Sequence, residues 1–136
     1  AATAKPSGMT ITEVSKATLA SEAYTVDFRQ GKETRVLKLV LEPGGTTGWH
    51  RHPQHGLFLV DKGTLTSYGL DGPPCEPVEF TPGKALSAGP HSQHAHLVRN
   101  LGTEPLEVTV LYFNLAAGEP GAVAADRPAE CPTTLN

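Results

Sequence analysis

The sequence has no long apolar run and no cluster of basic residues. Its longest apolar stretch, from Val36 to Leu41, is interrupted by Lys38, so no segment approaches the length of a membrane-spanning helix. Eleven basic residues are set against 14 acidic ones without a basic run, so nothing in the charge pattern favours nucleic acid or an anionic membrane. We therefore expect a protein that binds neither nucleic acid nor a membrane.

Cysteine is also scarce: only Cys75 and Cys131 are present, each beside a proline. The sequence opens with Ala1 rather than methionine, which fits a mature chain without its secretory signal and equally a chain trimmed by other means. In an oxidising compartment the two cysteines would pair, and closing such a loop would stabilise the fold by roughly 3–5 kcal/mol. Two unpaired surface thiols are the alternative. We expect a secreted or periplasmic protein with a Cys75–Cys131 disulfide.

Glycine and proline are abundant, with 14 and 12 residues, and they interrupt the chain every few positions. This density favours many short strands joined by turns over long helices. Asp61-Lys62-Gly63, between two β-prone runs, is typical of a hairpin turn. Strands are expected over residues 9–14, 24–28, 35–41, 49–52, 57–60, 64–70, 78–81, 85–88, 94–99 and 106–113.

The fold class that these strands predict is all-β, either closed into a barrel or folded into two sheets, because both arrangements protect strand edges. With 136 residues the chain is long enough to bury a real core. We expect residues 1–34 to form an N-terminal arm and the first strands, residues 35–114 the barrel core, and residues 115–136 an irregular tail, all in one domain.

Histidine is absent from the first 49 and the last 40 positions. The six histidines form two clusters: His50, His52 and His55, then His91, His94 and His96. Imidazole is the commonest protein ligand for zinc, copper, iron and nickel. Because side chains alternate faces along a strand, His50 and His52 point the same way, as do His94 and His96. If the two segments are neighbouring strands, three or four imidazoles converge on one metal site.

The spacing of these histidines carries a family resemblance. Gly44-x5-His50-x-His52-x10-Gly63 resembles the first motif of the cupins, and His96-x3-Asn100 resembles the end of the second. The resemblance covers residues from about 35 to 114. It implies a small jelly-roll β-barrel with a divalent metal held by His50, His52 and His96. It also implies that two copies can pair through an exposed sheet as a homodimer.

Two departures from the cupin pattern affect the site. The family's usual glutamate ligand falls at Gly56, and the proline and glycine that normally precede the last histidine correspond to His91 and Gln93. The predicted site therefore has three neutral ligands and no carboxylate. Such a site suits iron(II), copper(II), nickel or zinc, with open positions for water, oxygen or substrate, and suits manganese less well.

Further residues receive expected roles from strand parity. His94 is a candidate catalytic base, a fourth ligand or a substrate hydrogen-bonding group. Asn100 is expected to form the turn into Leu101 and Gly102. An apolar wall around the site is expected from Phe58, Val60 and Val98. The residues expected to face away from the metal are Trp49, Arg51, His55 and Arg99, and His91 is expected at the surface near the barrel mouth.

The leading functional hypothesis is a small-molecule oxidoreductase of the dioxygenase type. A three-histidine metal leaves adjacent positions open, so a substrate could chelate through two oxygens while dioxygen takes a third position. Two alternatives stay open: a non-catalytic extracellular module that binds metal or a small ligand, and a metal-dependent isomerase or lyase. The first alternative predicts a filled coordination sphere with His94 as the fourth ligand and little free space.

Overall fold

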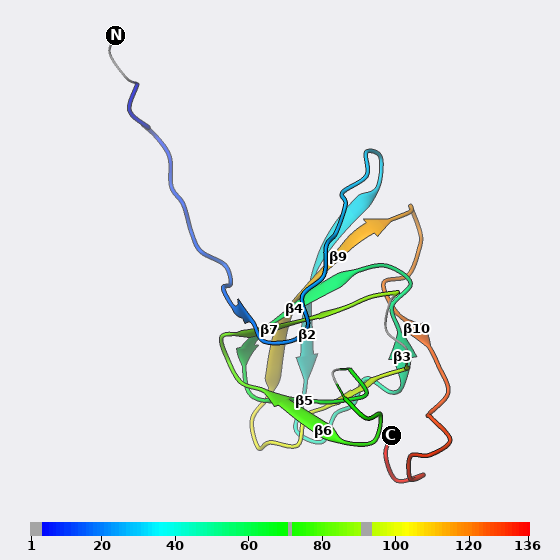
Figure 1. The fold of residues 1–136 in the computed structure, drawn as a ribbon. Helices are drawn as coiled ribbons and strands as arrows, with labels where there is room; N and C mark the ends of the chain where they lie inside the picture. The colour runs from blue at the N-terminus through cyan, green and yellow to red at the C-terminus, as the bar shows by residue number, and fades with distance from the viewer. Residues whose placement is uncertain (1–3, 71, 91–93) are drawn as a thin grey trace.

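The computed structural model describes residues 4–70, 72–90 and 94–136, and these residues form strands joined by turns and loops (Figure 1). His91 and Gln93, which stand where the cupin motif has proline and glycine, lie outside the described residues. The strands, in chain order, are β1 (Thr18–Leu19), β2 (Glu33–Leu41), β3 (His50–Arg51), β4 (Gly56–Lys62), β5 (Leu65–Tyr68), β6 (Pro77–Phe80), β7 (Lys84–Ala88), β8 (Leu97–Arg99), β9 (Leu106–Leu115) and β10 (Val123–Ala124).

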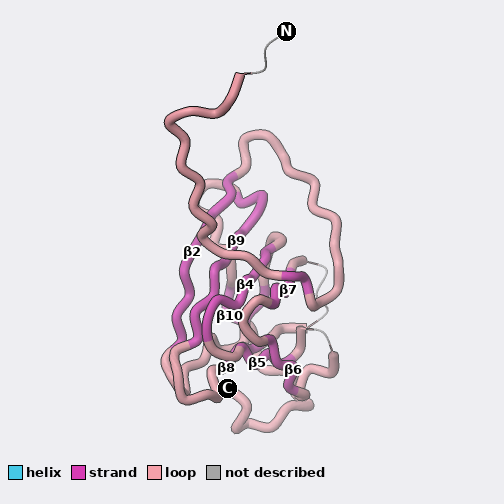
Figure 2. Tube along the Cα trace, turned by 90° about the vertical axis from the view of Figure 1, so that its left-hand side faces the viewer, coloured by secondary structure: helices cyan, strands magenta, loops and turns pink. Residues whose placement is uncertain are grey.

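The strands form three sheets. One has five strands in the order β1-β7-β4-β9-β2, one has three strands in the order β6-β5-β8, and one consists of β10 and β3. Figure 2 shows the same strands from the side, with loops making up the rest of the described chain. The predicted all-β fold is confirmed, and its described strands form packed sheets rather than one closed barrel.

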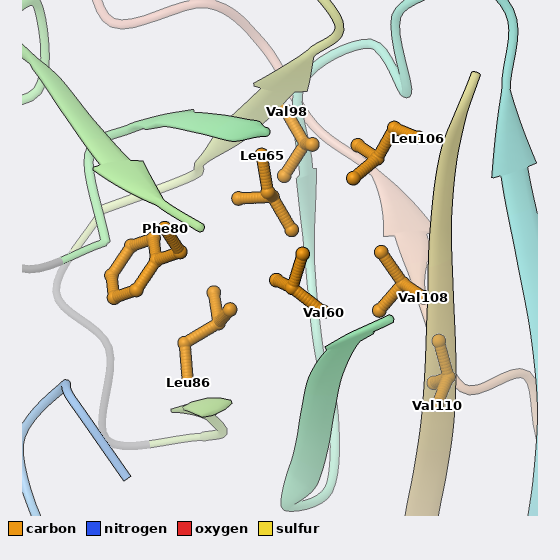
Figure 3. Close-up of a cluster of buried hydrophobic side chains, with 8 residues drawn as sticks. All are labelled: Val60, Leu65, Phe80, Leu86, Val98, Leu106, Val108 and Val110. Atoms are coloured by element: carbon orange, nitrogen blue, oxygen red, sulfur yellow. The ribbon is translucent and has the colours of Figure 1, made fainter. Parts of the chain in front are cut away.

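The main core lies between the two larger sheets. Side chains from both sheets meet there in one cluster (Figure 3), composed of Val60, Leu65, Phe80, Leu86, Val98, Leu106, Val108 and Val110. The longest ladder of the five-stranded sheet joins β2 to β9, which fits the prediction of strands over 35–41 and 106–113. Burial of this apolar surface is the main force that holds the sheets together.

The predicted hairpin at Asp61-Lys62-Gly63 is wrong. β4 pairs with β7 and β9, whereas β5 pairs with β6 and β8, so this turn carries the chain from one sheet to the other. Gly63 has a φ of +77°, and a Cβ there would lie 2.8 Å from the carbonyl oxygen of Pro105. Gly63 thus allows a close backbone contact at a change of sheet, not the reversal of a hairpin.

The strands expected over residues 9–14 and 24–28 are also absent, and β1 is the short strand that forms before β2. Met9, Ile11 and Val14 are exposed, with Val14 88% accessible, and the N-terminal end projects from the body of the molecule (Figure 1). Alternating apolar residues favour a strand only where a neighbouring strand supplies hydrogen bonds and a face to bury.

The C-terminal segment, residues 115–136, returns to the body instead of forming a wholly irregular tail. Val123 and Ala124 pair with β3 as strand β10. Cys131 forms a disulfide with Cys75, which confirms the predicted pair. Trp49 is buried with Cys131 and Leu135, and its indole Nε1 donates a 2.8 Å hydrogen bond to the carbonyl oxygen of Leu135.

The described part of the chain contains no helix with the length and apolar character needed to cross a membrane. A disulfide is compatible with an extracytoplasmic location, because disulfides persist in oxidising compartments.

Replacing Cys75 and Cys131 together by serine is expected to lower the free energy of unfolding by about 4 kcal/mol. The disulfide closes a loop with a sequence separation of 56, and its removal restores that loop's freedom to the unfolded chain. Urea denaturation of the two proteins under non-reducing conditions measures the difference. An unchanged unfolding midpoint would show that the disulfide adds nothing to stability.

Candidate metal centre

Backbone hydrogen bonds bring the two histidine clusters together. The amide of His50 donates to the carbonyl oxygen of His96 at 2.9 Å, and the amide of His96 donates to the carbonyl oxygen of His50 at 3.0 Å. This closely spaced antiparallel pair places the two residues directly opposite each other. The predicted pairing of the two segments is therefore present in the structure.

The three histidines expected to bind metal converge. One ring nitrogen each from His50, His52 and His96 lies within 4.8 Å of the others. The ring centroids are 4.9 Å apart for His50 and His52, 4.3 Å for His50 and His96, and 4.8 Å for His52 and His96. Three imidazoles at these separations are positioned for metal binding.

Hydrogen bonds to backbone carbonyls determine which ring nitrogen is protonated in His50 and in His52. Nδ1 of His50 lies 2.9 Å from the carbonyl oxygen of Gly48, and Nδ1 of His52 lies 2.9 Å from that of Gly121. A carbonyl only accepts hydrogen bonds, so each Nδ1 is the donor and each Nε2 keeps a free lone pair. This is the arrangement in which Nε2 can bind a metal.

Two buried ring nitrogens are left without hydrogen-bond partners among the described residues: Nε2 of His52 and Nδ1 of His96. Buried polar atoms are rarely left unsatisfied, because the loss of water is not compensated. A metal bound to Nε2 of His52 would replace the hydrogen bond that this buried nitrogen lacks among the described residues. The donor set thus fits a divalent transition metal.

Burial keeps the three imidazoles neutral. Loss of water lowers the pKa of His52 from 6.5 to about 4, with a smaller lowering from the charge of His50, although the hydrogen bond to Gly121 acts in the opposite direction. Burial, followed by the charges of His50, His52 and Arg51, lowers the pKa of His96 to about 2. The pKa of His50 is also lowered, mainly by burial. Neutral imidazole is the form that binds metal, so no proton has to be displaced near neutral pH.

The histidine cluster opens into a cavity of about 590 Å³. Its lining is largely apolar, and none of the described residues that line it carries a carboxylate. Phe58 and Val98 belong to this wall as expected, whereas Val60 lies in the core behind it. The apolar residues in the lining include Leu39, Phe58, Leu65, Leu86, Val98, Val108 and Val110.

Gly56, at the position of the family's usual glutamate, has no room for a side chain. A Cβ on Gly56 would lie 2.9 Å from Cζ of Phe58 and 3.2 Å from Cδ1 of Tyr112. Two aromatic rings therefore occupy the space where a carboxylate would begin. The predicted loss of the acidic ligand is accompanied by apolar packing, and the cluster stays free of negative charge.

The structure does not bring His94 into the cluster. His94 is half-buried, is not among the described residues that line the cavity and precedes β8 in a bend, so strand parity does not extend to it. Its role as a catalytic base or fourth ligand stays a prediction. His55 is half-buried and lines a separate small pocket beside Tyr24. His91 lies outside the described residues.

The charged and amide residues near the motifs lie largely as expected. Arg51 is exposed, and Arg99 donates hydrogen bonds to the carbonyl oxygens of Thr134 and Asn136. The amide side chain of Asn100 is fully buried; it accepts from the backbone of Gly102 and donates to two carbonyl oxygens. Asn100 thus forms the predicted turn.

Two features of the site were missed by sequence reasoning. Tyr112 lines the cavity, its ring centroid lies 5.6 Å from that of His52, and burial raises the pKa of its hydroxyl. It alternates with Val108 and Val110 along β9, so the same parity argument could have found it. Ala122, Val123 and Ala124 also line the cavity, and no local pattern in the tail indicates this.

Comparison with known proteins agrees with this architecture. Residues 37–112, more than half of the chain, match the family described as the cupin domain. The chain belongs to the cupin family. None of the curated proteins searched matches this cupin.

Several solved structures share the fold. A DMSP lyase structure is 22% identical with a TM-score of 0.55, covering 68% of this chain and 44% of that one. An oxalate oxidase is 21% identical with a TM-score of 0.53, covering 68% and 46%. A protein assigned as a sugar phosphate isomerase from Acidithiobacillus ferrooxidans is 24% identical with a TM-score of 0.51, covering 60% and 51%. This cupin spans about half the length of these structures.

The metal-free protein is expected to lose stability as the pH falls through the range set by His52. Its pKa is 6.5 in the unfolded chain and about 4 when folded, so the unfolded chain binds more protons in acid. The folded protein is therefore most stable at a pH above 6.5, where His52 is neutral in both states. Its stability declines as the pH falls from 6.5 toward the folded-state pKa of about 4. His52 alone contributes about 3 kcal/mol across this window.

Urea unfolding of the metal-free protein from about pH 7 to about pH 4 measures this dependence. A His52→Gln variant, which has no titrating group at this position, is expected to give a shallower slope. Equal slopes for the two proteins would contradict the account of a buried neutral imidazole.

Proposed function

We propose that this cupin is an extracytoplasmic metalloenzyme that acts on a small molecule, with a divalent transition metal held by His50, His52 and His96. The observation that carries the proposal is the convergence of three buried, neutral imidazoles at an apolar cavity. When bound, iron or copper supplies redox chemistry, and zinc or nickel supplies Lewis-acid chemistry. The disulfide supports the extracytoplasmic location.

The size of the cavity favours an enzyme over a non-catalytic metal-binding module. A module with a filled coordination sphere would need a fourth ligand, but His94 is not in the group of three among the described residues. A volume of about 590 Å³ beside the histidines is enough for a small molecule. The open side of the cluster therefore faces space that a substrate can occupy.

The character of the cavity wall favours an oxidoreductase of the dioxygenase type. Apolar side chains such as Phe58, Leu86 and Val110 exclude water from the neighbourhood of the histidines. Proton-transfer chemistry, as in an isomerase or lyase, calls for a carboxylate, histidine or similar group beside the substrate. Of the described residues in the lining, Thr47 and Tyr112 offer hydroxyls, none offers a carboxylate, and the Lys38 ammonium is paired with Asp61 at 2.9 Å.

The assembly proposed for this enzyme is a homodimer. Cupins often pair through an exposed sheet, and β2 lies at the edge of the five-stranded sheet. Val36 and Val40 of β2 are both exposed, which supports pairing on this side.

Elemental analysis of untagged protein tests the metal centre. We expect near-stoichiometric iron, copper, nickel or zinc, lost in both His50→Ala and His96→Ala because each removes one of three ligands. His55→Ala is the matched control, since His55 lies outside the group, and it should keep the metal. A wild-type protein that takes up none of these metals on reconstitution would overturn the proposal.

Oxygen consumption tests the class of reaction. Iron(II)-loaded protein, supplied with a panel of 2-hydroxy acids, 1,3-diketones and catechols, is expected to consume dioxygen with at least one compound. These compounds chelate through two oxygens, as the proposed open coordination positions require. The His96→Ala protein should consume none. Conversion of a panel compound without oxygen uptake would contradict the oxidoreductase and support the isomerase or lyase.

A further inference from the structure

The C-terminal segment lies beside the histidine cluster. Strand β10 pairs with β3, so that Ala124 lies opposite His50 and Val123 opposite Arg51. The amide of Ala125 extends this pairing with a 3.0 Å hydrogen bond to the carbonyl oxygen of Trp49. This segment lies beyond residues 37–112, the part of the chain that matches the cupin domain.

One residue of this segment contacts a candidate ligand directly. The carbonyl oxygen of Gly121 accepts the hydrogen bond from Nδ1 of His52 at 2.9 Å, across 69 positions of sequence. His50, in contrast, is oriented by Gly48, two residues before it. The orientation of His52 therefore depends on where the C-terminal segment lies, whereas the orientation of His50 is set within its own loop.

The segment is held in place at several points on both sides of Gly121. Nη1 of Arg35 donates to the carbonyl oxygen of Glu119 at 2.6 Å, before the contact with His52. After it come the disulfide at Cys131 and the hydrogen bond from Trp49 to Leu135. These anchors restrict the position of the Gly121 carbonyl, as expected of a group that orients a ligand.

Gly121 also lies too close to Tyr112 to be replaced by a larger residue without movement. A Cβ on Gly121 would lie 2.7 Å from Cζ of Tyr112 and closer still to two other ring carbons. The absence of a side chain at 121 lets the backbone approach the ring and reach His52. This close approach gives the role of Gly121 a direct test.

We propose that Gly121 is a positioning residue for the metal centre: its carbonyl, held by the C-terminal segment, fixes the tautomer and orientation of His52. The expected consequence is tighter metal binding, and this part of the inference rests on the proposed function. It assigns to the C-terminal segment a part in building the site that the cupin core does not supply. Removing such a hydrogen-bond partner typically weakens metal binding about 10–100-fold.

The test compares Gly121→Ala with Gly72→Ala, a matched control in which the added Cβ meets nothing within 4 Å. Zinc affinity, measured by chelator competition, is expected to fall about 10–100-fold in Gly121→Ala and to stay unchanged in Gly72→Ala. Adding Tyr112→Leu to Gly121→Ala removes the crowded ring and is expected to restore most of the affinity. Zinc affinity in Gly121→Ala within about threefold of wild type would overturn the assignment.

A second readout does not require metal. Nitrogen-15 NMR of the metal-free protein at neutral pH should show His52 protonated at Nδ1, and in Gly121→Ala the ring should populate the Nε2-protonated form. An Nε2-protonated His52 in the wild type would overturn the inference. Because this readout is independent of zinc, a wild type that binds no zinc but shows the Nδ1 form would reject the proposed function and not the role of Gly121.

If Gly121→Ala does not fold, the Cys75→Ser, Cys131→Ser double variant replaces it. This variant frees one anchor of the C-terminal segment while every residue of the cavity lining stays unchanged. The double variant is expected to bind zinc more weakly than wild type and to show a mixture of His52 tautomers. Wild-type zinc affinity together with a pure Nδ1 form would contradict positioning by the anchored segment.

Discussion

Two reciprocal backbone hydrogen bonds between His50 and His96 join segments that lie 46 residues apart, and the geometry of the site depends on them. The pairing places one imidazole of each histidine cluster on the same side of the sheet. Strand alternation then adds His52, two residues after His50. Backbone pairing, which is insensitive to side-chain identity, thus brings the histidine backbones together, and the hydrogen bonds to Gly48 and Gly121 orient the rings of His50 and His52.

Burial gives these three imidazoles their chemical character. In water each would titrate near neutral pH, but the loss of water lowers all three pKa values and leaves neutral rings. The energetic cost appears as buried nitrogens that have no partner in the described part of the chain, including Nε2 of His52. Aromatic rings fill the space beside Gly56, where a carboxylate would otherwise begin, so the cluster remains neutral. A divalent cation is the ligand that such a group of lone pairs would attract.

The parts of the fold that depend on local pattern could be predicted from the sequence. The strand over residues 35–41 and the shared direction of His50 and His52 follow from alternation, and the Asn100 turn follows from its amide chemistry. The change of sheet at Gly63 could not be predicted, because the choice between reversing within a sheet and crossing to another depends on distant partners. Strand parity gives no support for the expected alignment of His94 with His96, since regular strand structure begins only at Leu97.

The contribution of the C-terminal segment had no sequence signal. Residues 121–124 contain two alanines, a glycine and a valine, and they acquire a role only when the disulfide and β10 bring them to the histidines. Pairing of this kind depends on long-range contacts that composition and periodicity do not encode. The segment is therefore the clearest example here of a functional element that required the three-dimensional structure.

X-ray absorption spectroscopy of zinc-loaded protein tests the central claim most directly. The account predicts a first shell with three imidazole nitrogens at about 2.0–2.1 Å, completed by oxygen from solvent, and no such zinc centre in His96→Ala, which loses the metal. A wild-type first shell made mainly of oxygen, or an imidazole count unchanged in His96→Ala, would show that His50, His52 and His96 do not together hold the metal.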